Sequence, residues 1–475
     1  MASRRSDAQK TGRQTMAQYD LVIKNGTVVN PLGTFQADIG VRGGKIACIA
    51  DQLPKGAQTY DARGKLVMPG GIDIHTHIDT PLNGSHTLDD WYQGTVSAAC
   101  GGVTCVVDYP MQEKGHSLRD IINKWSEKAG GSAVIDYSFS PVITERTEAA
   151  YAEIPALIEE GFPTWKVYMA YWHRVRDEEI IRLLDVISSS GGILGIHCEN
   201  DFAIDYLTKK LLDAGRIEPK YHPVSRPPVC EEDATERVIN LAEMVDANVL
   251  IVHMSCERAL RRAREAHARS NNVYVETCPH FLLLDESAYD QPLEEAAKYV
   301  ITPPLRRESD REALWQGIRS GDIKLVSSDH CAFPYKEKLS LGRESFATIP
   351  HGAPGVEGRL PIVFSEGVSK GRISAEKFVE IVSTNPARIA GMYPQKGIIA
   401  VGSDADITVF DPDKEVTLSV AQMHSNCDFS PYDGVRVKGY PVATFSRGAL
   451  VYRDGEPVGE RGHGRLVFRR HFERF

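Results

Sequence analysis

The sequence predicts an α/β fold: a (β/α)8 TIM barrel with a small β-sandwich domain built from both ends of the chain. Through the middle of the chain, short apolar runs alternate with amphipathic stretches of helical spacing, the pattern of a parallel sheet covered by helices. Eight such runs occur, which favours a closed barrel over an open sheet. Strand patterns separated by glycine turns occur at the two ends of the chain and indicate a separate antiparallel unit.

The two ends of the chain supply the predicted sandwich. A disordered tail over residues 1–18 precedes the first part, residues 19–70, and the second part spans residues 391–460. A C-terminal extension over residues 461–475 follows. Both parts contain residue pairs suited to tight turns, which need positive φ: Asn25-Gly26, Gly43-Gly44, Arg447-Gly448 and Asp454-Gly455.

The barrel is predicted over residues 71–390. Residues 177–190 and 233–244 have the apolar spacing of helices that cover a sheet on one face. The eight apolar runs that we expect to form its parallel strands are GGIDIHTHI, GVTCVVDY, AVIDYSFS, PTWKVYMA, GGILGIHCE, ANVLIVHMS, NVYVETCPH and IKLVSSDH.

Composition narrows the class of partner. The 475 residues are 42% hydrophobic and 25% charged, with a net charge of −9 and no basic stripe, so we expect a small-molecule substrate, no nucleic acid and no membrane partner. The nine cysteines are scattered, odd in number and without a CxxC pair, which argues against a disulfide framework. The first eighteen residues lack the apolar core of a signal peptide. We therefore expect a cytoplasmic protein.

Polar side chains interrupt five of the apolar runs near their carboxyl ends, where the active sites of such barrels lie. Each alone has an ordinary explanation, such as a hydrogen-bonded core histidine. Burying all of them without partners would cost several kcal/mol each, so a shared divalent metal is the economical explanation. The candidates are His75, His77, Lys166, His197, His253 and Asp329. The histidines expected at the surface are His86, His116, His173, His222, His267, His424, His463 and His471.

Several motifs, in this order and spacing, carry a family resemblance: GIDIHTH, KVYMAY, IHCEN, VHMS, ETCPH, TPPLR, SSDH and GAPGVEGRLPIVFSEGV. From Tyr19 to about Arg469 the chain resembles the cyclic amidohydrolases, specifically the dihydropyrimidinase and hydantoinase branch. The resemblance implies a homotetramer in which the C-terminal segment reaches a neighbouring subunit. It also implies two zinc ions, or other divalent metals, bridged by N6-carboxylated Lys166. His75, His77 and Asp329 would hold one metal, and His197 and His253 the other.

The implied reaction is hydrolytic opening of a cyclic ureide or amide to an N-carbamoyl amino acid by a metal-activated hydroxide. Asp329 would carry the proton from the water to the departing ring nitrogen. Tyr171 would donate a hydrogen bond to the tetrahedral oxyanion. Thr302 and His351 occupy substrate-binding positions where family members commonly have serine and asparagine, so substrate preference is the property that these departures affect. The loops over residues 79–91 and 109–117 are expected to line the pocket for the ring substituent.

Substrate charge separates the possible activities. Dihydroorotase-like relatives carry an arginine two residues after the His-x-His pair, where it grips the substrate carboxylate. This chain has Asp79 there, which predicts neutral rings: 5,6-dihydropyrimidines and 5-substituted hydantoins. The alternatives are another cyclic amidohydrolase, such as an allantoinase or dihydroorotase, and a non-catalytic scaffold of the same fold, which would lack ligands at positions that are filled here.

Overall fold

Eight parallel strands form the centre of the molecule. The computed structural model describes residues 17–82, 84–269 and 272–475; most of the predicted tail over residues 1–18 lies outside the described residues. The strands form a three-stranded sheet, in the order β10-β9-β6, and a five-stranded sheet, in the order β11-β12-β13-β14-β15. Each predicted apolar run contains one of them: β6 (Gly71–Thr76), β9 (Val103–Asp108), β10 (Asp136–Phe139), β11 (Thr164–Tyr168), β12 (Ile193–His197), β13 (Val249–Ile251), β14 (Val273–Thr277) and β15 (Leu325–Val326).

Single parallel bridges link the two sheets at both edges. Val142, just after β10, bridges Lys166 on β11, and Thr76 on β6 bridges His330, just after β15. Thr76, Val142 and His330 lie at the carboxyl ends of strands or beyond them, and Lys166 is the middle residue of β11. The residues that follow several strands are therefore brought close together at one end of the two sheets.

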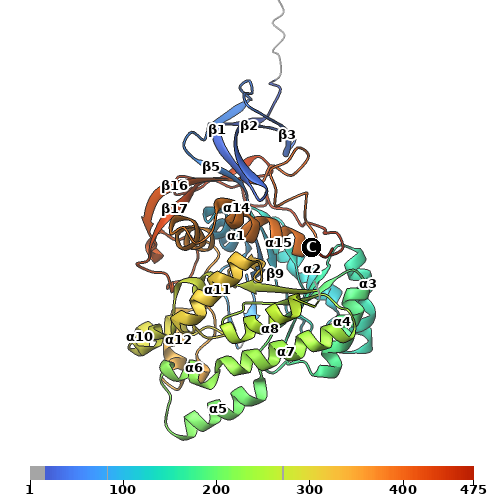
Figure 1. Ribbon diagram of the computed structural model, residues 1–475, viewed down its shortest axis with the longest axis vertical. Coiled ribbons are helices and arrows are strands. Elements are labelled where there is room, and N and C mark those ends of the chain that lie inside the picture. Colours follow the sequence, from blue (N-terminus) through green and yellow to red (C-terminus); the bar gives the residue numbers. More distant parts are fainter. Residues whose placement is uncertain (1–16, 83, 270–271) are drawn as a thin grey trace, which may run out of the picture.

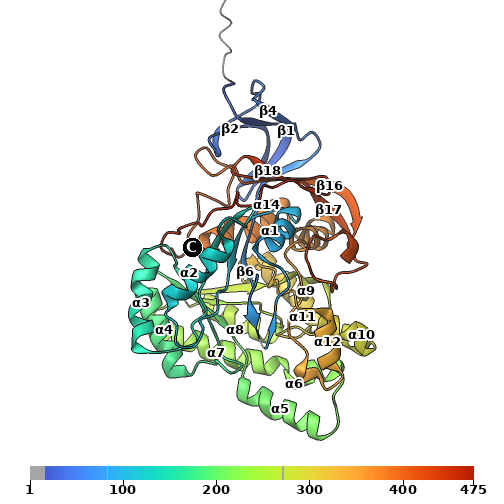
Figure 2. The same cartoon turned by 180° about the vertical axis from the view of Figure 1, so that it is seen from behind.

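Helices surround the parallel strands (Figures 1 and 2). In α4, the buried residues Ile180, Leu183, Leu184 and Ile187 recur at helical spacing, and this apolar stripe faces the sheet. No helix among the described residues is long and apolar enough to cross a membrane. The α-helices are α1 (Trp91–Cys100), α2 (Leu118–Ala129), α3 (Glu148–Glu159), α4 (Asp177–Ser189), α5 (Asp201–Asp213), α6 (His222–Ser225), α7 (Pro228–Met244), α8 (Glu257–His267), α9 (Pro279–Leu283), α10 (Leu293–Ala296), α11 (Glu308–Ser320), α12 (Tyr335–Gly342), α13 (Arg359–Val363), α14 (Ala375–Val379) and α15 (Asn385–Ile389).

Both ends of the chain join one nine-stranded sheet, at the opposite end of the molecule from α5 (Figure 1). The antiparallel pairing of β5 with β16, with Val67 opposite Val409, connects the two parts. A short separate hairpin pairs β7 (Pro81–Leu82) with β8 (Ser85–His86). The strands of the large sheet are β1 (Leu21–Asn30), β2 (Gly33–Arg42), β3 (Lys45–Ala50), β4 (Gln58–Asp61), β5 (Leu66–Pro69), β16 (Ile407–Thr417), β17 (Arg436–Ser446), β18 (Ala449–Arg453) and β19 (Glu456–Pro457).

One predicted turn is wrong. Asn25-Gly26 lies inside β1, where the pairing with β2 shifts register between Ile23 and Gly26, and Asn25 has a φ of 60°. The pair therefore forms a β-bulge, which needs the same positive φ as a tight turn. A side chain on Gly26 would also clash, because its Cβ would lie 2.3 Å from Cγ2 of Val67.

The C-terminal segment packs against the parallel strands of its own chain. Leu466 bridges Tyr137 on β10, and Arg469 is buried, with Nη1 donating to Oγ1 of Thr164 at the start of β11. The ring of Phe472 lies 5.2 Å from that of Tyr274 on β14. These contacts lie toward the amino ends of the strands, the edge opposite to the polar residues. The contact with a neighbouring subunit and the homotetramer stay predictions.

Candidate metal centre and active site

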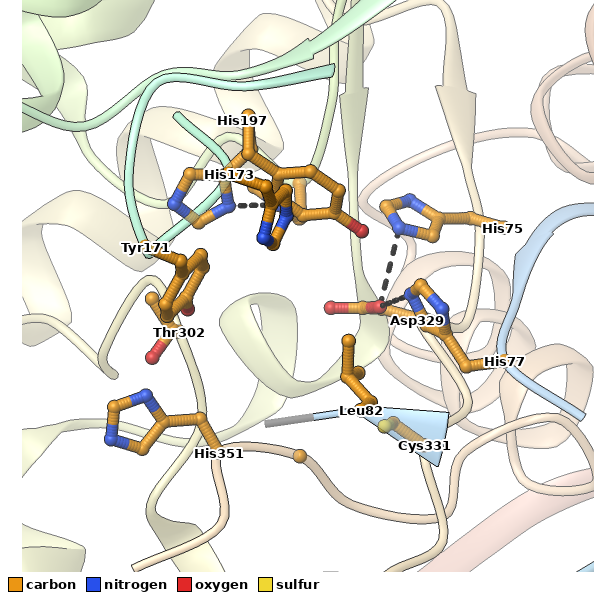
Figure 3. A pocket seen from close by; sticks show the side chains of 13 residues that line it. His75, His77, Leu82, Tyr171, His173, His197, Thr302, Asp329, Cys331 and His351 are labelled. Atoms are coloured by element: carbon orange, nitrogen blue, oxygen red, sulfur yellow. Dashed lines mark hydrogen bonds and ion pairs between the residues drawn. The ribbon is translucent and has the colours of Figure 1, made fainter. Parts of the chain in front are cut away.

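Three of the predicted ligands form one cluster. His75 and His77 come from the end of β6, and Asp329 follows β15 with a φ of 50°. Nε2 of His75 lies 3.2 Å from Oδ1 of Asp329, and Nε2 of His77 lies 3.3 Å from the same oxygen. The carboxylate thus faces both imidazoles (Figure 3). One ligand atom from each residue lies within 4.8 Å of the others, which is close enough for one metal ion.

The other three predicted residues lie beside this cluster. His197 ends β12 and His253 follows β13, and Nδ1 of His197 lies 2.9 Å from Nε2 of His253. The ring centroids of His75 and His253 are 5.5 Å apart, so the two groups adjoin. Lys166, on β11, is fully buried, and its Nζ lies 4.9 Å from the ring centroids of Tyr109 and Tyr168. The fold therefore brings all six side chains together.

Two buried glutamates fix which imidazole nitrogen faces the centre. Oε1 of Glu276 lies 2.7 Å from Nδ1 of His75, which leaves Nε2 facing Asp329. Oε2 of Glu199 lies 2.9 Å from Nε2 of His197, which leaves Nδ1 facing His253. A carboxylate behind a histidine fixes its tautomer and makes the ring a better metal ligand. The sequence prediction missed both glutamates, although each is an acid at the end of an apolar run.

Arg226 keeps the carboxylate behind His197 charged. Burial alone would raise the pKa of Glu199, but Arg226 and His197 outweigh it and hold the pKa at about 2. Nη1 of Arg226 lies 2.5 Å from Oε2 of Glu199. The guanidinium and the carboxylate are both buried, so each compensates the charge of the other.

The electrostatics of the centre favour neutral nitrogen groups. Burial lowers the pKa of Lys166 to about 8, although Glu276 and Asp329 act in the opposite direction. Burial and the neighbouring His197 hold the pKa of His253 well below its usual range. Among the described residues, no hydrogen-bond partner reaches Nζ of Lys166, Nδ1 of His77 or Nδ1 of His253. Imidazoles grouped around a carboxylate can bind divalent cations.

A pocket opens over the centre. Tyr171, Thr302 and His351 line it on the side opposite to His75, His77 and Asp329 (Figure 3). Tyr171 follows β11 with a φ of 74°, and its backbone N–H donates to Oδ1 of Asp201. Burial raises the pKa of the Tyr171 hydroxyl to about 12, so it stays protonated at neutral pH. It can donate a hydrogen bond to a developing negative charge.

The structure differs from the prediction in the burial of two histidines and in the residues that line the pocket. His173 and His222, which were expected at the surface, are buried, and His173 lines the pocket. From the two loops that were expected to line it, only Leu82 is among the described lining residues; Asn83 lies outside the described residues. The signal that could have found His173 is its place two residues after Tyr171, on the same loop.

Asp79, which takes the place of the arginine of dihydroorotase-like relatives, pairs with two side chains outside the described pocket lining. Its Oδ2 lies 3.0 Å from Nζ of Lys128, and Oδ1 lies 3.5 Å from Nε2 of His86. Asp79 is not among the described lining residues, and none of those residues is an arginine. Because the carboxylate of Asp79 is paired with Lys128, this residue does not set the substrate charge. The feature that bears on substrate charge is the absence of an arginine from the described lining.

Comparison with known proteins finds relatives along most of the chain. A family model described as the amidohydrolase family matches residues 66–451, and one described as the N-terminal domain of the urease alpha-subunit matches residues 2–60. The chain is 42% identical to a D-hydantoinase of Ralstonia pickettii over 96% of this chain and 100% of the relative, and 43% identical to a D-hydantoinase of Geobacillus stearothermophilus over 94% and 96%. It is similar in structure to a dihydropyrimidinase from Brevibacillus agri NCHU1002, with a TM-score of 0.93, 44% identity, and coverage of 95% of this chain and 99% of the other.

Proposed function

The chain belongs to the amidohydrolase family, and we propose that it is a hydrolase that opens neutral cyclic ureides and amides. The substrates in this proposal are 5,6-dihydropyrimidines and 5-substituted hydantoins, and the products are N-carbamoyl amino acids. The observation that carries it is the convergence of six candidate ligands, five buried and Asp329 partly exposed, below a pocket whose far wall offers a protonated tyrosine hydroxyl. The proposal agrees with the names of relatives that are more than 40% identical.

The donor set fits two divalent metal ions, which we take to be zinc. His75, His77 and Asp329 would hold one ion, and His197 and His253 the other, with carboxylated Lys166 between them. The fit is supported by the buried Nζ of Lys166, which lacks a hydrogen-bond partner among the described residues and whose lowered pKa makes the nucleophilic amine accessible near neutral pH. When bound, the ions would activate water at neutral pH and polarise the amide carbonyl.

In this proposal, Asp329 moves the proton. Both of its short contacts within the described part of the chain use Oδ1, and Oδ2 faces the pocket (Figure 3). In ring opening, the water oxygen bonds to the carbonyl carbon and the ring carbon–nitrogen bond breaks. Asp329 takes the proton from the attacking water and gives it to the departing nitrogen.

Tyr171 stabilises the charge that develops during this attack. Its hydroxyl keeps its proton and donates a hydrogen bond to the oxygen of the former carbonyl. The loop that carries Tyr171 is held by the hydrogen bond from its backbone to Asp201. A hydrogen-bond donor that already points at the developing charge in a buried site needs little reorganisation during the reaction. Such donors are effective for this reason.

The pocket favours a neutral ring. A substrate carboxylate needs a cationic partner when it is buried, and no arginine belongs to the described lining. Dihydroorotate would therefore leave its carboxylate without the paired contact that an arginine supplies. Dihydrouracil, dihydrothymine and hydantoins carry no such group.

The test is a panel of kcat/KM values for zinc-loaded enzyme with dihydrouracil, hydantoin, phenylhydantoin, allantoin and dihydroorotate. We expect N-carbamoyl products from the first three and little turnover of dihydroorotate. A tenfold lead of dihydroorotate would overturn the assignment to neutral rings, and a tenfold lead of allantoin would make the chain an allantoinase. Metal-loaded protein that opens no ring would favour a non-catalytic scaffold.

We also propose that the two parallel sheets form one closed barrel and that the nine-stranded sheet curls into a small sandwich. The bridges Val142–Lys166 and Thr76–His330, one at each edge, support closure. Apolar residues from β1, β2, β5, β16 and β17 share one buried cluster, which supports the curled sheet. The cytoplasmic location stays a prediction.

A further inference from the structure

Two histidines on the pocket wall have no role in the proposed chemistry. His173 and His351 both line the pocket. His173 is 2% exposed, and neither of its ring nitrogens has a hydrogen-bond partner among the described residues. Nε2 of His351 is likewise buried and unpartnered within the described part of the chain. Three imidazole nitrogens beside the same pocket therefore lack partners.

Both rings flank Tyr171. The ring of His173 stacks near that of Tyr171, with centroids 6.1 Å apart and planes 15° apart. The ring of His351 lies 6.5 Å from that of Tyr171 on centroids. Since Tyr171 faces the reacting carbonyl in the proposed function, the two imidazoles lie beside the bound ring. A group attached to that ring is within their reach.

Neighbouring polar groups are already engaged. The ring of His222 lies 4.9 Å from that of His351, but Nε2 of His222 donates to the carbonyl of Ile301 at 2.7 Å. The guanidinium of Arg226 is paired with Glu199. Neither residue forms a hydrogen bond with the three unpartnered imidazole nitrogens. The free nitrogens remain available for a ligand.

The chemistry of these nitrogens defines the group that they would bind. A buried polar group without a hydrogen bond costs about 1–3 kcal/mol, so the pocket favours a ligand that supplies the missing partners. Burial lowers the pKa of His173 to about 4 and holds that of His351 well below its usual range. Both rings are thus neutral at pH 7, and each neutral imidazole offers one donor and one acceptor. A neutral group that both donates and accepts matches them.

We propose that His173 and His351 form the subsite for the substituent of the ring and select substituents that carry a neutral hydrogen-bonding group, a carboxamide or a hydroxyl, over alkyl and aryl substituents. This inference rests on the proposed function and deepens it by naming the substrate class. An alkyl group would leave the imidazole nitrogens without partners. A site built to hydrogen-bond a substrate group discriminates strongly against an analogue that lacks it.

The test uses two hydantoins of nearly equal size, 5-(carbamoylmethyl)hydantoin and 5-isobutylhydantoin. Both compounds contain the same hydantoin ring, so the comparison of their kcat/KM values tests the contacts of the substituent with the pocket wall and not the choice of ring. We expect zinc-loaded wild-type enzyme to favour the carboxamide by tenfold or more in kcat/KM. Equal rates, or a preference for the isobutyl compound, would overturn the proposed subsite. Turnover of unsubstituted hydantoin in the same experiment would still support the proposed function. Failure to open any hydantoin or dihydrouracil would instead overturn the function.

Variants of His173 and His351 test which imidazole carries the preference for the carboxamide. His173→Phe and His351→Leu should each lower the ratio about tenfold, because each removes hydrogen bonds while keeping an apolar body of similar size. His173→Gln, which keeps a donor and an acceptor, should retain most of the preference. His471→Phe, at an exposed position in the C-terminal segment and outside the pocket lining, is the matched control and should leave the ratio unchanged. A ratio that is the same in His173→Phe, His351→Leu and wild type would contradict the assignment.

Discussion

Oε1 of Glu276 lies 2.7 Å from Nδ1 of His75, and the same oxygen accepts the backbone N–H of His253 at 3.0 Å. One carboxylate oxygen on β14 thereby connects a candidate ligand at the end of β6 with another just after β13. Both side chains of the pair are buried. The glutamate thus orients ligands on both halves of the centre from behind.

Glu276→Gln should weaken metal binding about 10–100-fold, because a neutral amide supports the His75 tautomer less well than a carboxylate. The measurement is the dissociation constant for zinc, from competition with a chelator. Glu178→Gln changes an exposed glutamate on α4 and is the control. Equal zinc affinity in both variants would mean that Glu276 serves only packing.

Lys166→Ala should lose both metals and the activity, because it removes the side chain proposed to bridge them. Formate or acetate should restore part of the turnover, since a small carboxylate can stand in for the carbamate oxygens. Lys166→Arg should not recover, because arginine cannot be carboxylated in this way. Full activity of Lys166→Ala without an added carboxylate would contradict the bridging role.

Tyr171→Phe should keep the metal content and lower kcat by about 10²–10³-fold, the usual cost of losing one oxyanion donor. Phenylalanine keeps the aromatic ring, whose centroid lies 5.5 Å from that of His197 in the wild type, so the packing there is retained. Steady-state rates and metal content measured on the same preparation separate the two effects. A wild-type kcat would assign Tyr171 to packing.

Phe472→Ala should destabilise the fold by about 3 kcal/mol, because it removes a buried ring from the C-terminal segment where this segment packs on Tyr274. Phe468→Ala, in the same segment but 63% exposed, should change stability by about 0.5 kcal/mol or less. Denaturant unfolding curves measure both. Equal effects would show that the segment does not depend on the buried ring.

Much of this architecture could be predicted because its signals are local. The apolar runs mark the eight parallel strands, and a histidine or aspartate that interrupts such a run, as His197 and Asp329 do, stands out without any structure. The bulge at Asn25 was read as a turn because bulges and turns share the need for positive φ.

The remaining features depend on contacts between distant parts of the chain. The carboxylate of Asp79 pairs with Lys128, 49 residues away, and this lysine also donates a hydrogen bond to the backbone carbonyl of Asp79. His173 lies in a loop, and the way in which this loop folds brings its ring against Tyr168 and Tyr171 and buries it. Loop packing leaves no periodic pattern in the sequence, so its burial could not be read there.

The central claim, a two-metal centre that opens a cyclic ureide, is tested most directly by metal reconstitution. Enzyme stripped with a chelator is titrated with zinc in the presence of bicarbonate, which supplies carbon dioxide for Lys166, and the initial rate of hydantoin opening is followed at each step. The account predicts almost no rate without metal and a plateau at two zinc ions per chain. An undiminished rate in the metal-free enzyme, or a plateau at one ion, would contradict it.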